Sequence, residues 1–179
     1  MLKTILISFV SILVILTIAG FIAAKVPSTV VIEHTFNASV DKVWMHWTSV
    51  ESIKKWWGPT YYTAPTIKSD FQVGGTYLLS MKAADGTMHF NSGTYKEIIL
   101  NQKIVTAMSF ADENGKAIPG RDVAVPGSWP DEVTVTVEFR ENNGNTEVKV
   151  TEEGIPSIMY LFSKLGWKQQ FEKFENLLK

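Results

Sequence analysis

The chain has 179 residues, enough for one globular domain, and its hydrophobic share of 45% with a charged share of 20% is typical of a folded protein rather than a disordered one. Its net charge of −1 gives no electrostatic support for a nucleic-acid partner. Cysteine is absent, which excludes disulfide bonds, thiol catalysis and zinc sites built on thiolates.

The N-terminal 25 residues differ from the rest of the chain. The run from Thr4 to Ala24 is 21 residues long, carries no charge and is rich in Ile, Leu and Val, with Lys3 before it and Lys25 after it. As a helix it would extend about 31 Å, which matches the hydrocarbon core of a bilayer. We therefore expect a transmembrane anchor here; a cleaved signal segment is the alternative.

The leader sets the expected domain organisation and location. We expect residues 1–25 to be the anchor or signal segment and residues 26–179 to form a single domain. A short N-terminal span before a long domain most often leaves that domain outside the cytoplasm, so we expect a membrane-anchored, extracytoplasmic protein. If the leader is instead cleaved, the domain is secreted.

The domain begins with a strand and two short helices. The β-branched stretch 29–36 predicts a strand, and Ser39 is a suitable cap for the helix that follows. Apolar residues then recur at helical spacing. A second short helix starts after Ser49 and ends at Gly58-Pro59. The residues on the apolar faces of these two helices are Val40, Val43, Trp44, Trp47, Ile53, Trp56 and Trp57.

Strands dominate the middle of the chain. Alternation and turn residues predict strands over 63–70, 76–82, 88–99, 103–110, 133–139 and 147–151. The segment 111–130, rich in proline and glycine, is too long for a simple turn. It is either a lid over a cavity, touching a ligand through Val125 or Trp129, or a surface excursion.

A long helix is expected at the C-terminus, because Trp167, Phe171, Phe174 and Leu178 form one apolar stripe. The element order predicts an α+β helix-grip fold. In it, a curved antiparallel sheet of about six to seven strands wraps around the C-terminal helix, with the two short helices following the first strand.

An ordered set of motifs carries a family resemblance across residues 29–178. Trp56-Trp57-Gly58-Pro59 is followed by the run from Asp70-Phe71 to Tyr77, then by Gly93-x-Tyr95, and finally by Gly166-Trp167-x3-Phe171. This set resembles the START-like (SRPBCC) superfamily, and within it the branch named for homologues of the activator of a heat-shock-protein ATPase. The resemblance implies the helix-grip fold and an apolar cavity between the sheet and the long helix. The N-terminal membrane segment departs from the soluble members of that family.

The aromatic residues are the candidates for lining such a cavity. Large flat side chains bury an apolar ligand at low entropic cost, and methionine adapts to irregular shapes. The same residues also suit a packed core, and both interpretations stay open at this stage. The candidate ligand-binding residues are Trp44, Trp47, Trp56, Trp57, Tyr77, Met81, Tyr95, Met108, Phe110, Trp129, Trp167 and Phe171.

Catalytic chemistry has weaker support in the sequence. His89, Asn91, Tyr95 and Glu97 share one parity along a predicted strand, so these four would form a polar end to the cavity, or else face solvent. The catalytic candidates among them are His89, Tyr95 and Glu97. In an apolar site, desolvation would raise the pKa of Glu97 and suit it to acid–base work. Nucleophile, nucleotide and zinc motifs are absent from the sequence, so no cofactor and no metal is expected.

The functional expectation is therefore the binding of a small hydrophobic molecule, lipid-like or aromatic, without assigned catalysis. The alternatives are a cyclase-like enzyme that uses the polar candidates, or a chaperone or stress-response domain with an unknown protein partner. The membrane is an expected partner through residues 4–24, and nucleic acid is not.

Overall fold

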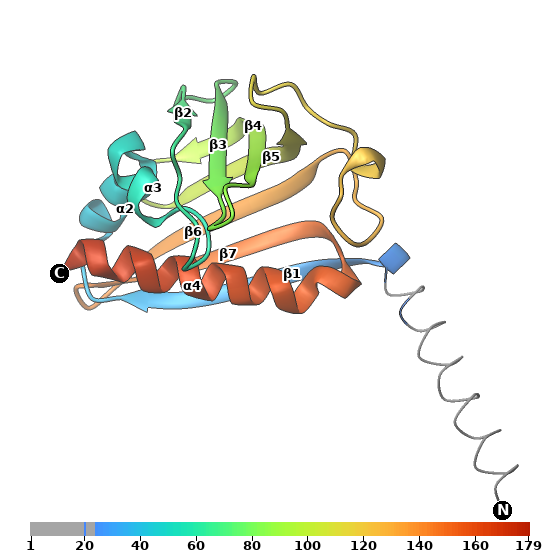
Figure 1. The fold of residues 1–179 in the computed structure, drawn as a ribbon. Coiled ribbons are helices and arrows are strands. Elements are labelled where there is room, and N and C mark those ends of the chain that lie inside the picture. The colour runs from blue at the N-terminus through green and yellow to red at the C-terminus, as the bar shows by residue number, and fades with distance from the viewer. Residues whose placement is uncertain (1–19, 21–23) are drawn as a thin grey trace, which may run out of the picture.

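The computed structural model of the chain describes residue 20 and residues 24–179. Within these residues the chain forms one antiparallel sheet, two short helices and one long helix (Figure 1). The elements in chain order are β1 (Pro27–Phe36), α2 (Val40–Thr48), α3 (Val50–Trp56), β2 (Ile67–Ser69), β3 (Thr76–Lys82), β4 (Met88–Ile99), β5 (Lys103–Ala111), the 3-10 turn η1 (Gly120–Asp122), β6 (Val133–Asn142), β7 (Asn145–Pro156), the 3-10 turn η2 (Ser157–Met159) and α4 (Tyr160–Leu178).

The described strands form a seven-stranded sheet in the order β1-β7-β6-β5-β4-β3-β2. Every pairing is antiparallel, and the first strand closes onto the last. The long helix α4 crosses the sheet beside β1 and also packs on α2 and α3 (Figure 1). This arrangement confirms the predicted α+β helix-grip fold, including the two short helices after the first strand.

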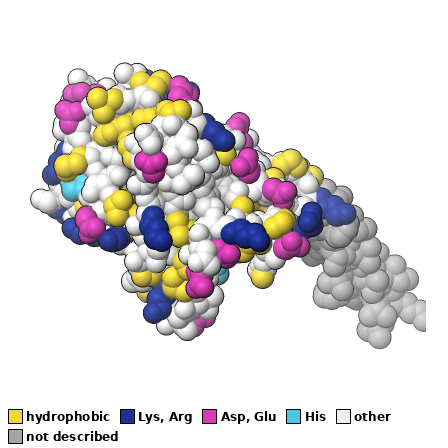
Figure 2. Space-filling model, turned by 90° about the horizontal axis from the view of Figure 1, so that it is seen from above, with side chains coloured by type: hydrophobic (Ala, Val, Ile, Leu, Met, Phe, Trp, Pro, Cys, Tyr) yellow, Lys and Arg dark blue, Asp and Glu magenta, His cyan; other side chains and the backbone are white. Residues whose placement is uncertain are grey.

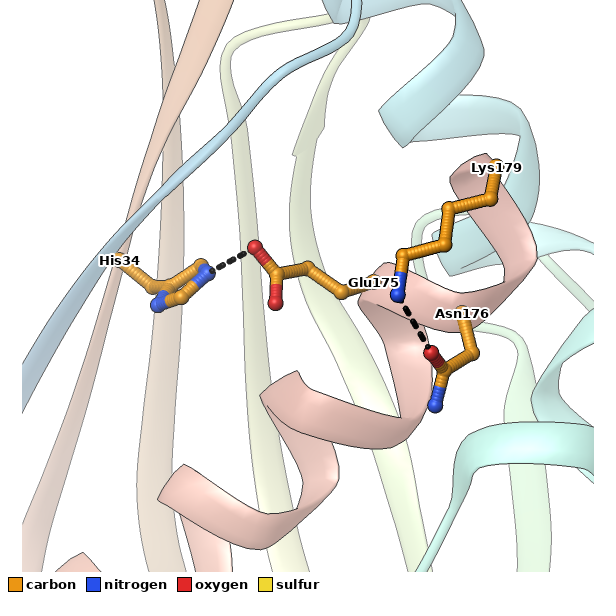
Figure 3. Close-up of polar contacts among 4 residues, drawn as sticks. All are labelled: His34, Glu175, Asn176 and Lys179. Carbon is orange, nitrogen blue, oxygen red and sulfur yellow. Dashed lines mark hydrogen bonds and ion pairs between the residues drawn. The ribbon is translucent and has the colours of Figure 1, made fainter.

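The buried apolar residues of the described part of the chain form one hydrophobic core between the sheet and the helices. Phe174 of α4 is completely buried, and its ring lies 4.9 Å from that of Phe36 and 5.3 Å from that of Trp56. At the outer end of the same helix, the His34 ring nitrogen lies 3.2 Å from Glu175 (Figure 3). The second half of α4 is therefore held to β1 by both apolar and polar contacts.

The predicted boundaries differ from the observed ones where local contacts decide them. The strand expected over 63–70 shrinks to β2, although Thr63 keeps an isolated bridge to Lys82. The strand expected over 147–151 extends over the whole of β7, because it pairs with β1 along its full length. The segment 111–130 contains only one 3-10 turn, η1.

The predicted membrane segment falls almost entirely on residues 1–19 and 21–23, which lie outside the described part of the chain. Among the residues that are described, no helix combines the length and the apolar character needed to cross a bilayer.

Candidate functional site

An apolar cavity of about 80 Å³ lies between the sheet and α4, and we call it the inner cavity. Alternate residues of neighbouring strands form its floor, because side chains two apart on a strand point to the same face. The two short helices and α4 close it from the other side. Its wall consists of Trp47, Ile53, Trp56, Trp57, Phe71, Tyr77, Leu79, Tyr95, Ile104, Thr106, Met108, Val135, Val137 and Trp167.

Many of the predicted ligand-binding residues lie on this wall, and others do not. Those on the wall are Trp47, Trp56, Trp57, Tyr77, Tyr95, Met108 and Trp167. Those away from it are Trp44, Met81, Phe110, Trp129 and Phe171. Trp44 packs on Phe139 with ring centroids 5.1 Å apart, and Phe171 packs on Phe36 at 5.7 Å. These two rings are packed against other core side chains and do not border the inner cavity.

Phe110 and Trp129 pack on each other instead of on the inner cavity. Their ring centroids are 5.0 Å apart, and the Trp129 indole donates a hydrogen bond to the backbone carbonyl of Pro126. Phe110 shares parity with Met108, but it lies near the end of β5, beyond the cavity. Since neither Trp129 nor Val125 reaches the wall, the segment 111–130 does not cover the inner cavity as a lid.

Several wall residues were not among the candidates. Ile104, Thr106, Val135 and Val137 follow from strand alternation, which the sequence carried clearly. Phe71 lies in an irregular segment after β2 and had no periodic signal. Its ring meets the Tyr95 ring at 5.1 Å and the Trp44 ring at 6.0 Å, so it joins the cavity wall to the core.

The polar groups of the wall are mostly satisfied by hydrogen bonds within the protein. The Tyr77 hydroxyl donates to Thr106 Oγ1 at 3.3 Å, and the Tyr95 hydroxyl lies 2.8 Å from Ser69 Oγ. Burial raises the pKa of both tyrosines, so they stay neutral phenols at physiological pH. They therefore present hydroxyl groups, not phenolate bases, to the inner cavity.

Trp57 has the polar wall group that lacks a hydrogen-bond partner within the described part of the chain. Among the described residues its indole Nε1 is the one buried side-chain nitrogen or oxygen without a hydrogen-bond partner. A buried donor without an acceptor costs about 1–3 kcal/mol, so such groups are rare and call for an explanation. Trp57 lines the inner cavity, so this unpaired donor belongs to a residue of the candidate site.

The second half of α4 makes hydrogen bonds to the turn that follows α3. This turn, residues 57–62, carries Trp57, and we call it the Trp57 corner. Lys173 Nζ donates to the carbonyls of Trp57, Gly58 and Tyr62 at 3.2, 2.9 and 3.1 Å. Gln170 Oε1 accepts a hydrogen bond from the Gly58 amide at 3.0 Å. Burial lowers the pKa of Lys173. These contacts fix the backbone from which the Trp57 ring projects.

The predicted polar row does not assemble. His89 is exposed near the start of β4, while Tyr95 is buried on the inner cavity. Glu97 does not share the face of Tyr95, because the register of β4 against β5 shifts between these two residues. This β-bulge inserts one residue and turns Glu97 to the surface, where it lies 2.8 Å from Lys103. The assumption of unbroken alternation was therefore wrong for Glu97.

A buried carboxyl that the sequence analysis missed lies behind the wall. Glu152 on β7 is 7% exposed, pairs across the sheet with Val30 and Val135, and accepts a hydrogen bond from Ser163 of α4. Burial raises its pKa, while hydrogen bonds from Ser163 and Trp167 oppose the rise. Glu152 holds α4 and the Trp167 ring in place and does not itself line the inner cavity.

Other concave surfaces do not suit an apolar ligand. A larger groove of about 1330 Å³ is lined mainly by polar and charged side chains, and two ion pairs lie within this lining. Arg140 lies 3.0 Å from Glu147, and Lys149 lies 3.2 Å from Glu138. Among the described residues, no group of three His, Asp or Glu side chains is placed to hold a metal ion. The inner cavity is accordingly the candidate site.

Comparison with known proteins agrees with this fold. The family model described as Activator of Hsp90 ATPase homolog 1-like protein matches residues 37–179. The chain therefore belongs to this family, as the motifs of the sequence indicated. A search of curated proteins found no match.

Solved structures with the same fold come from several bacteria. The crystal structure of a Chromobacterium violaceum protein shares 22% identity, with a TM-score of 0.70, over 83% of this chain and 95% of that one. An Arthrobacter aurescens protein solved by NMR also shares 22% identity, with a TM-score of 0.70, over 84% and 85% of the two chains. The AHSA1 protein from Silicibacter pomeroyi shares 16% identity, with a TM-score of 0.67, over 84% and 97%. At these identities the likeness concerns the fold alone.

Proposed function

We propose that this domain binds a small, mostly apolar molecule with one hydrogen-bond acceptor, held in the inner cavity between the sheet and α4. The observation that carries the proposal is an apolar cavity whose wall includes Trp57, the residue whose buried Nε1 lacks a hydrogen-bond partner among the described residues. An apolar wall with few polar groups is typical of ligand sites. The resemblance to the START-like superfamily implies a ligand cavity in the same place.

The size of the inner cavity restricts the ligand. Its volume of about 80 Å³ is well below the roughly 300–1,000 Å³ of sites for drug-sized molecules. An engineered core cavity of about 150 Å³ is known to admit benzene. The volume therefore favours a compact ring-sized molecule over a lipid chain, with Met108 and Leu79 as the flexible wall residues that would make room.

The wall chemistry restricts the ligand further. A free indole N–H requires an acceptor such as a carbonyl or ether oxygen. A charged ligand is disfavoured, because the wall residues provide no charge to compensate its desolvation. A neutral aromatic aldehyde or ketone meets both requirements.

The proposal is tested by ¹H–¹⁵N NMR with two probes of nearly equal shape, benzaldehyde and toluene. Benzaldehyde is expected to move the Trp57 indole resonance downfield and to bind more tightly than toluene. The Trp57→Phe variant should bind the two probes alike. Trp44→Phe is the matched control, since it changes a buried tryptophan away from the wall, and it should keep the preference for the aldehyde.

The proposal would be overturned if neither probe moved any resonance of the wall residues at concentrations near the solubility limit. It would also fail if Trp57→Phe preserved the preference for benzaldehyde. In that case another donor, such as the Tyr77 hydroxyl, would recognise the acceptor.

A further inference from the structure

The first half of α4 exposes a run of large apolar side chains to solvent. Leu161 is 74% exposed, Phe162 is 67% exposed and Leu165 is 53% exposed. Ile158 of η2 adjoins them. We call Ile158, Leu161, Phe162 and Leu165 the α4 patch. Single exposed apolar residues are normal on a protein surface, but a cluster of four over about two helical turns marks an interaction surface.

The rest of the helix provides an internal reference. After Gly166 the exposed positions of α4 are polar, as expected for a helix that faces water: Lys168, Glu172 and Asn176. Elsewhere the surface is mixed in charge, and on the face drawn in Figure 2 basic and acidic side chains lie interspersed. Other exposed apolar side chains of the described residues, such as Tyr61, Val73 and Leu100, belong to different parts of the chain, whereas the α4 patch gathers four of them on one short stretch.

The α4 patch lies where the domain meets its apolar N-terminal run. The Ser157 amide and hydroxyl both donate to the carbonyl of Val26, at 2.8 and 2.9 Å. Pro27 pairs with Pro156, and the Ser128 amide donates to the carbonyl of Ala24. Figure 1 shows the start of β1 and the start of α4 at the same end of the domain. Leu165 is only about 8 Å further along the helix than Tyr160.

We infer that the α4 patch lies in the headgroup region of the lipid bilayer in which residues 4–24 are proposed to be embedded. A tether that ends at Ala24 holds the start of α4 close to the bilayer, and exposed Leu and Phe side chains gain free energy by leaving water there. Lys164 lies between Phe162 and Leu165 in the chain and Lys168 follows one turn later, which suits anionic headgroups. Tyr160, stacked beneath Lys164 at 5.6 Å, is a residue type enriched at such interfaces.

This inference extends the proposed function and does not depend on it, because the α4 patch and the inner cavity share no residue. Docking through the patch would orient the domain with the start of α4 toward the lipid. A domain joined to the membrane only by a flexible tether would have no such fixed orientation.

The absence of cysteine makes a direct test available, since one introduced cysteine is the only labelling site. The full chain is placed in nanodiscs of phosphatidylcholine and phosphatidylglycerol, with an environment-sensitive fluorophore attached at Leu161→Cys. The matched control is Asn176→Cys, exposed on the same helix about 22 Å further along. Quenchers attached to the lipid acyl chains near the headgroup report contact with the bilayer.

We expect a blue-shifted emission and strong quenching at position 161, and neither at position 176. Replacing Phe162 and Leu165 by serine should remove the quenching at position 161 without changing the unfolding transition. Equal quenching at both positions, or none at either, would overturn the inference. A blue shift at position 161 that appears without lipid and grows with protein concentration would assign the α4 patch to a second copy of the chain, which also overturns it.

Discussion

The two halves of α4 are built for different environments, although they belong to one continuous helix. The second half buries Phe171 and Phe174 and grips the Trp57 corner through Gln170 and Lys173. The first half contacts the sheet through the Ser163–Glu152 hydrogen bond and exposes the α4 patch. The contrast indicates that the second half contributes stability and shapes the cavity, whereas the first half is available for an interaction.

The largest expected effect tests this division with one substitution at two places. Phe174→Ala removes a completely buried ring and should lower the free energy of unfolding by about 3–5 kcal/mol. Phe162→Ala removes an exposed ring and should change it by less than about 0.5 kcal/mol. Chemical denaturation measures both values. Similar losses for the two variants would mean that the halves do not differ in this way.

Removing the hydrogen bonds that Lys173 makes from the second half of α4 is expected to have the next largest effect on stability. Lys173→Met keeps the aliphatic stem but leaves three carbonyls without their donor, which should cost about 1–3 kcal/mol. Lys168→Met, at an exposed position of the same helix, should be nearly neutral. Hydrogen exchange should also become faster over residues 57–63 in the first variant only. Unchanged exchange there would show that Lys173 does not hold the corner.

The Trp57 corner requires a glycine at position 58. Gly58 has a φ of 86°, and an added Cβ would lie 3.1 Å from Tyr62 Cβ and 3.2 Å from Met81 Cγ. Gly58→Ala should therefore cost more than the roughly 1–2 kcal/mol of a left-handed residue alone. Gly74→Ala, at a similar φ of 83° with open space around it, measures the backbone cost by itself. If the two variants lost equal stability, crowding at the corner would play no part.

The smallest expected effect is the pH dependence of stability that comes from Glu152, the residue that accepts a hydrogen bond from the first half of α4. Because burial raises the pKa of Glu152, the unfolded chain releases this proton at a lower pH than the folded one. The contribution of Glu152 to stability is therefore greatest below its ordinary pKa and is lost as the pH rises through the raised value. Glu152→Gln should gain stability relative to the wild type as the pH rises above the ordinary glutamate pKa of about 4.3. Glu153→Gln, the exposed neighbour, serves as the control. A difference that does not change with pH would contradict a raised pKa.

Much of the fold followed from local signals in the sequence. Helical spacing placed Trp44 and Trp47 on the buried face of α2, and alternation in 133–139 placed Val135 and Val137 inside. The errors arose where a nonlocal contact decides the outcome. The bulge between Tyr95 and Glu97 depends on the register with β5, and the length of β7 depends on its pairing with β1.

The site was harder to predict than the fold, because wall and core use the same residue types. No local pattern distinguishes Trp57, which lines the inner cavity, from Trp44, which is packed on Phe139. Glu152 was missed for a related reason. From the sequence alone, one acidic residue near the end of a strand is expected to face solvent. Only the position of α4, whose Ser163 donates a hydrogen bond to Glu152, shows that this carboxyl is buried.

The existence of space between α4 and the sheet is the central claim, and xenon tests it most directly. Xenon is an apolar atom that enters dry core cavities. A crystal of the protein pressurised with xenon should show one strong peak bordered by Trp57, Tyr95 and Met108. If the wall side chains closed on each other and no peak appeared there, the inner cavity would be filled by the protein itself and could not hold a ligand.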